Sequence, residues 1–65
     1  MENEIRFFIS LYLDGTLEIE CKHMHYAFDD RFNFDNIPKE DLFSRMAEIQ
    51  EHCVGEGISA KFVLL

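Results

Sequence analysis

The first part of the chain alternates apolar and polar residues with the period of a β-strand. Residues 17–26 repeat this alternation after Asp14-Gly15, a dipeptide typical of β-hairpin turns. The pattern therefore predicts two strands, 5–13 and 17–26, joined as a hairpin. The apolar face of the first strand comprises Ile5, Phe7, Ile9, Leu11 and Leu13.

The register of this hairpin depends on keeping apolar residues opposite one another. A turn confined to Asp14-Gly15 would place Leu11 opposite Glu18, whereas a three-residue loop, 14–16, places it opposite Ile19. We therefore expect the three-residue loop. Its facing pairs are Leu13 with Leu17, Leu11 with Ile19, Ile9 with Cys21 and Phe7 with His23.

Residues 27–37 allow two interpretations. Asp29-Asp30 is a candidate turn, and a short strand 31–34 after it would keep Phe32 and Phe34 on the core side. The alternative is an irregular loop whose phenylalanines fill the edge of the core. Both interpretations direct these aromatic rings toward the interior.

From Pro38 the apolar residues recur at helical spacing and predict a helix over 38–53. Proline at the first position favours this start, and Gly55 and Gly57 favour an end shortly after residue 53. Residues 58–65 alternate again and predict a closing strand. The expected core stripe of the helix comprises Leu42, Phe43, Met46, Ala47, Ile49 and Cys53.

These elements predict a single α+β domain, residues 1–65, with the order β-β-(β)-α-β. One helix packs on one face of a small antiparallel sheet, so the opposite face stays open. Aromatic residues and methionine, which are enriched in interface cores, fall among charged residues on that face. The predicted partner-binding residues are Phe8, Tyr12, Met24 and Tyr26 for contact, with Glu18 and Glu20 fixing orientation; Val63 and Leu65 share the face. The alternative is an ordinary surface, since folded proteins expose much apolar area.

The length of the chain supplies a second reason to expect a partner. A domain of 65 residues buries only about 60% of the surface that its unfolded chain exposes, which leaves a thin margin of stability. We therefore expect a homodimer, to which the edge of strand 58–65 could add main-chain pairing.

The charge balance excludes several kinds of partner. Thirteen acidic residues against six basic ones give a net charge of −7, and no Lys/Arg cluster is present. Direct binding to nucleic acid or to an anionic membrane is therefore disfavoured. The acidic residues either solvate the surface or imitate nucleic-acid phosphate toward a basic partner. The first four residues are acidic where a signal peptide would be basic, and two cysteines suit a reduced compartment, so we expect a cytoplasmic protein.

Cys21, His23 and His25 form the strongest candidate for chemistry, since a strand 17–26 would place all three on one face. Cysteine and histidine are zinc ligands, so a metal-stapled or catalytic mini-domain is the alternative function. We favour no metal, cofactor or catalytic activity, because the paired spacing of zinc modules and a phosphate-binding loop are both missing. Cys53 and His52 are neighbours on a helix and would point in different directions.

In size, charge and compactness the chain resembles the small acidic α+β proteins with which phages and mobile elements inhibit host machinery, such as anti-CRISPR proteins. No motif contributes to this resemblance. It implies an inhibitor or regulator that occupies a partner's surface, with a host defence or nucleic-acid enzyme as the most concrete target. The expected function is therefore a small acidic protein-binding module.

Overall fold

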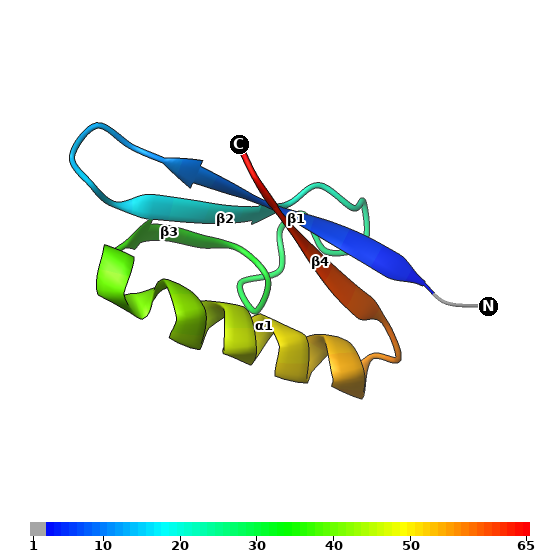
Figure 1. Ribbon diagram of the computed structural model, residues 1–65. Coiled ribbons are helices and arrows are strands. Elements are labelled where there is room, and N and C mark those ends of the chain that lie inside the picture. The colour runs from blue at the N-terminus through cyan, green and yellow to red at the C-terminus, as the bar shows by residue number, and fades with distance from the viewer. Residues whose placement is uncertain (1–2) are drawn as a thin grey trace.

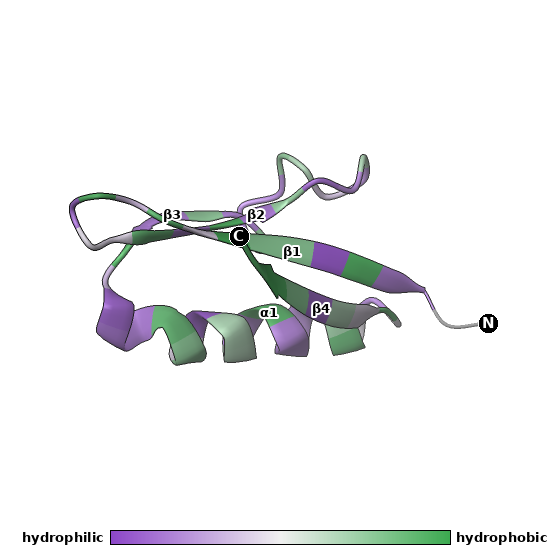
Figure 2. Ribbon diagram, turned by 45° about the horizontal axis from the view of Figure 1, so that its top comes forward, coloured by the Kyte–Doolittle hydropathy of each residue, from purple (hydrophilic) through white to green (hydrophobic). Residues whose placement is uncertain are grey.

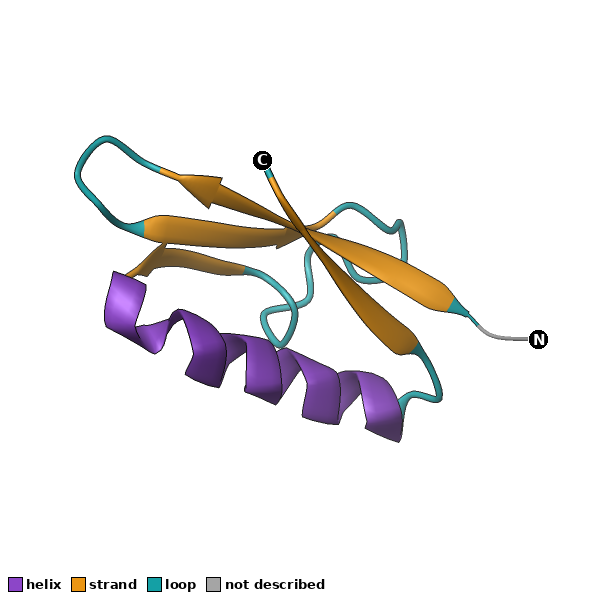
Figure 3. Ribbon diagram, viewed as in Figure 1, coloured by secondary structure: helices purple, strands orange, loops and turns teal. Residues whose placement is uncertain are grey.

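A four-stranded sheet carries one α-helix across one of its faces (Figures 1 and 3). The computed structural model describes residues 3–65; Met1 and Glu2, which belong to the acidic start noted above, lie outside them. The predicted α+β class, with the helix packed on the sheet, is confirmed. Its elements are β1 (Glu4–Leu11), β2 (Leu17–Cys21), β3 (Phe34–Ile37), a short 3-10 helix (Lys39–Asp41), α1 (Leu42–Gly55) and β4 (Ser59–Leu64).

The strands lie in the order β3-β2-β1-β4. The β1–β2 and β2–β3 pairings are antiparallel, as predicted, whereas β4 runs parallel to β1. Because β3 points the same way as β1, it also points the same way as β4. A tight turn cannot join two such strands, so α1 carries the chain across the sheet from one edge to the other.

The hairpin register differs from the predicted one by two positions. Asp14 Oδ1 accepts hydrogen bonds from the Thr16 amide (2.9 Å) and hydroxyl (2.7 Å), and the Tyr12 amide donates to the Thr16 carbonyl (2.9 Å). These bonds close a longer loop over residues 12–16, so the predicted three-residue loop was wrong. The even shift keeps Phe7, Ile9 and Ile19 facing the core, but placing Leu11 and Leu13 on the core face was wrong, since both are exposed where the hairpin extends beyond the helix-covered part of the sheet. The observed pairs are Leu11 with Leu17, Ile9 with Ile19, and Phe7 with Cys21.

Strand β2 ends at Cys21, so the prediction that it continues to residue 26 was wrong. The Cys21 amide donates to the side-chain oxygen of Asn33 (2.8 Å), and residues 22–33 form a looped segment of turns. The predicted strand 31–34 was also misplaced, since β3 begins at Phe34. Phe32 nevertheless fills the core from this loop with no exposed surface, as the loop alternative predicted.

The helix begins as a 3-10 turn directly after Pro38 and continues as α1 to Gly55. Gly57 then adopts a left-handed backbone with φ of 72°, which confirms the predicted helix stop. Phe43 and Ala47 are exposed, so placing them in the core stripe was wrong. The stripe that faces the sheet is narrower and comprises Leu42, Met46, Ile49 and Cys53.

The core lies between α1 and the sheet. Phe7 is fully buried at its centre, with its ring centroid 5.6 Å from that of Phe62 and 5.9 Å from that of Phe32. Each such buried side chain stabilises the fold by about 1.5–3 kcal/mol. Figure 2 shows hydrophobic and hydrophilic residues alternating along β1, and its hydrophobic residues supply part of this core. The buried set is Ile5, Phe7, Ile9, Leu17, Ile19, Cys21, Phe32, Ile37, Ile49 and Cys53.

Candidate partner-binding surfaces

The sheet face turned away from α1 has an apolar centre. Phe8 lies on this face because its neighbours along β1 are buried on the other. In the sheet register Phe8 sits between Glu20 of β2 and Val63 of β4. The Lys22 ammonium lies 5.6 Å from the centroid of the Phe8 ring, which is within cation–π range. The open face therefore places an apolar pair inside a charged border.

One end of this open face is anionic. Glu18 lies opposite Ser10 on it, and Tyr12 follows at the end of β1 with 38% of its surface exposed. The pKa of Tyr12 is raised to about 12, chiefly because Glu18 accepts a hydrogen bond from the phenol. Partial desolvation and the negative charge of Asp35 raise this pKa further. The raised pKa of Tyr12 therefore reflects the negative charge gathered at this end of the open face.

The predicted contact residues do not all share this face. Phe8, Tyr12, Glu18 and Glu20 are brought together, as the alternation predicted. Met24 is 82% exposed in the loop after β2. Tyr26 instead packs against the core, with its ring centroid 5.0 Å from that of Phe32 and the two rings nearly perpendicular. Because β2 ends at Cys21, these last two residues do not extend the strand face.

A second surface lies between α1 and β4, where an open groove of about 710 Å³ follows the edge of the sheet. The pattern contained a signal for it, because the helix has more apolar positions than the sheet can cover. Phe43 and Val54 are 79% and 77% exposed. The groove is lined by Ala47, Gln50, Glu51, Cys53, Val54, Ile58, Ser59 and Ala60.

The outer edge of β4 carries unpaired main-chain groups. The Ser59 amide donates inward to Asn3, directly before β1, at 2.8 Å, and the Leu65 amide donates inward to Ile9 of β1 at 2.9 Å. Alternate residues of a strand direct their N–H and C=O groups to opposite sides. The groups of Ala60, Phe62 and Leu64 therefore point outward, where no other strand among residues 3–65 pairs with them.

The two edges of the sheet differ in protection. At the β3 edge, Asn36 has a φ of 54° and the register with β2 shifts between Leu17 and Ile19. Asp35 and the following Pro38 further discourage pairing there. Strand β4 instead pairs regularly with β1 over its whole length and contains neither proline nor an acidic residue. The β4 edge is therefore the one open to another strand.

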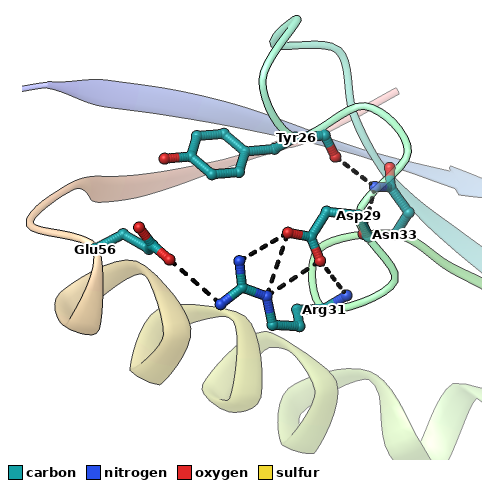
Figure 4. Close-up of polar contacts among 5 residues, drawn as sticks. All are labelled: Tyr26, Asp29, Arg31, Asn33 and Glu56. Atoms are coloured by element: carbon teal, nitrogen blue, oxygen red, sulfur yellow. Dashed lines mark hydrogen bonds and ion pairs between the residues drawn. The ribbon is translucent and has the colours of Figure 1, made fainter.

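A polar network holds the loop that follows β2 (Figure 4). The Arg31 guanidinium donates to the Asp29 carboxylate (2.8 Å) and to Glu56 after α1 (3.3 Å). Asn33 donates to the Tyr26 and Asp29 carbonyls, both at 2.8 Å. Hydrogen bonds from Arg31 hold the pKa of Asp29 below its ordinary value. These contacts fix the loop against the helix and give the network a structural role.

The predicted alternative site at Cys21, His23 and His25 is not assembled. Cys21 is buried in the core, where desolvation raises the pKa of its thiol. The two histidines lie outside in the loop, with ring centroids 5.2 Å apart and the His25 amide donating to His23 Nδ1. Within residues 3–65, His, Cys, Asp and Glu form no group of three or more that could hold a metal ion.

Burial also opposes a nucleophilic role for Cys53. Its thiol is 1% exposed and its pKa is raised by desolvation, which lowers the fraction of reactive thiolate. His52 is exposed and packs edge-on to the Phe32 ring, at a centroid distance of 6.1 Å. The two neighbours thus face different surroundings, as expected from their spacing on a helix.

Over the described part of the chain, no helix has the length and apolarity needed to cross a bilayer. Comparison with protein-family models, curated proteins and solved structures found no significant match to this chain.

Proposed function

We propose that the protein is a small protein-binding module that acts by occupying a surface on a partner, as inhibitors and regulators do. The observation that carries the proposal is the apolar pair Phe8–Val63 at the centre of the open sheet face. A one-sided sheet normally directs polar residues outward. Apolar residues ringed by charges on such a face are typical of interaction surfaces.

The charges of the open face indicate the chemistry of the partner. Glu18 and Asp35 surround the Tyr12 phenol closely enough to raise its pKa to about 12. A complementary surface would place Lys or Arg opposite these carboxylates and apolar side chains opposite Phe8. The groove of a nucleic-acid enzyme has this basic character, and the net charge of −7 favours approach to it. Such a partner would be inhibited because its groove is occupied.

The test is affinity capture from lysate of the native cell, with bound proteins identified by mass spectrometry. Phe8→Ala/Tyr12→Ala should lose the captured partner, and Phe28→Ala, whose ring is 98% exposed in the loop after β2, should retain it. Glu18→Lys/Glu20→Lys should weaken capture without removing any apolar contact. Circular dichroism and thermal unfolding of each variant verify the fold.

Capture at two salt concentrations distinguishes the contribution of the apolar centre from that of the negative charges. Binding governed by the apolar centre should change little between low and moderate salt, whereas binding governed by imitation of phosphate should fall steeply. Equal recovery of the same partner by the parent and by folded Phe8→Ala/Tyr12→Ala would show that the open face is not the binding surface.

A further inference from the structure

The unpaired edge of β4 lies beside an exposed face of α1 that is apolar except for Gln50. Helix α1 contacts β4 more extensively than it contacts any other strand, and Figure 1 shows β4 beginning beside the C-terminal end of α1. Residues 43, 47, 50 and 54 follow one another at intervals of four, three and four, which places them on one helix face. Three of these four residues line the groove against β4.

The outward main-chain groups of β4 match those of a second β4 in the antiparallel direction. A two-fold axis through Phe62 would pair Phe62 with its own copy, and Ala60 with Leu64 of the other chain. These are the three residues whose N–H and C=O groups point outward, so each facing pair can exchange two hydrogen bonds. The same register opposes Lys61 to Val63, and the two lysines do not face each other.

The charge distribution also selects this edge for self-association. The chain carries −7 overall, so most of its surface repels a second copy. Strands β1, β2 and β3 each contain acidic residues, whereas β4 contains a single lysine and no acid. An apolar strand with one cation can therefore approach its own copy with no carboxylate on either strand, and the acidic residue beside this edge is Glu51 of the groove.

We propose that the protein forms a symmetric dimer in which two β4 strands pair antiparallel about Phe62. The pairing joins two four-stranded sheets into one continuous sheet and leaves both α1 helices on the same face. The two α1–β4 grooves then face each other across the axis, so Val54 and Ala47 approach the partner. The two open faces become one continuous platform, although the dimer itself does not depend on what binds there.

The first measurement is the mass of the untagged protein by multi-angle light scattering across micromolar concentrations. We expect twice the chain mass of 7.7 kDa. Amide hydrogen exchange read residue by residue should show slow exchange at Phe62 and Leu64, and faster exchange on dilution. A monomeric mass at all concentrations, or rapid exchange at both amides in the dimer, would overturn the proposal.

Proline substitutions at two adjacent positions distinguish an effect on pairing at the β4 edge from an effect on the stability of the fold. Leu64→Pro removes an outward N–H and should shift the protein toward monomer. Leu65→Pro removes the inward N–H that donates to Ile9, so it should lower stability while the dimer persists. A Leu64→Pro protein that is folded by circular dichroism and fully dimeric would contradict pairing through β4. Capture by the open face tests the proposed function separately, because Phe8→Ala/Tyr12→Ala leaves the β4 edge intact.

Discussion

The side-chain oxygen of Asn33 accepts the backbone N–H of Cys21 at 2.8 Å, which supplies the last residue of β2 with a partner from outside the strand pairing. The amide nitrogen of the same side chain donates to the carbonyls of Tyr26 and Asp29. One side chain thus completes the end of a strand and closes the loop that follows it.

Replacing Asn33 should therefore loosen the loop and the strand end together. Asn33→Ala removes three partly buried hydrogen bonds and should lower the free energy of unfolding by about 2 kcal/mol. Urea unfolding followed by circular dichroism measures this change. Asn33→Asp keeps the acceptor for Cys21 but sets a carboxylate oxygen against the Tyr26 and Asp29 carbonyls, so its loss should be at least that of the alanine variant. An alanine variant as stable as the parent would show that water replaces these bonds.

Phe32 and Phe28 belong to the same loop and differ fully in exposure, at 0% and 98%. Phe32→Ala opens a cavity against Phe7 and Tyr26 and should cost about 3–5 kcal/mol. Phe28→Ala should change stability by less than about 0.5 kcal/mol. The comparison is made by thermal unfolding, and Phe32→Leu, a milder change, keeps the test readable if the alanine variant does not fold. Similar losses at the two positions would refute the core role of Phe32.

Replacement by alanine should have opposite effects on stability at Gly55 and at Gly57. Gly55 is helical with open space around it, so Gly55→Ala should stabilise the protein by about 0.5–1 kcal/mol. Gly57 has a φ of 72°, and Gly57→Ala should destabilise by about 1–2 kcal/mol even though its added methyl group meets no atom within 4 Å. Chemical denaturation of both variants gives the signs, and a stabilising Gly57→Ala would contradict the left-handed helix stop.

Protonation of Asp29 should make the free energy of unfolding depend on pH in the acidic range. Arg31 lowers the pKa of Asp29 in the folded protein below the ordinary value of 3.8. The stabilisation that the ionised Asp29 contributes is therefore present above about pH 4. It is lost as the pH falls through the lower pKa of Asp29 in the folded protein. Free energies of unfolding measured from neutral pH to about pH 2 should fall less steeply for Asp29→Asn than for the parent.

Asp30→Asn serves as the control for this acid dependence, because it removes an adjacent exposed carboxylate outside the network shown in Figure 4. It should retain the slope of the parent. Identical pH profiles for Asp29→Asn and the parent would show that the ion pair with Arg31 does not stabilise the fold.

The candidate surfaces were predictable to different degrees. Alternation places Phe8, Glu18 and Glu20 on one face as soon as their strands are recognised, because side-chain direction along a strand is a local property. Met24 and Tyr26 were assigned to that face only through a strand that ends earlier. The excess of apolar positions on the helix was visible in the pattern, but the place of the groove beside β4 could not be predicted from it, because that requires the position of α1 against a strand distant in the sequence.

The sequence by itself determined most of the residues that face the core, the position of the helix and the α+β class, because periods of two and of about 3.6 residues reflect local backbone geometry. Tertiary structure decided the hairpin register, the end of β2 at Cys21 and the parallel direction of β4. The end of β2 involves the Cys21–Asn33 bond between residues far apart in sequence, and the direction of β4 follows from the crossover of α1. Which edge of the sheet stays unpaired depends on these long-range contacts, so the local sequence pattern could not predict it.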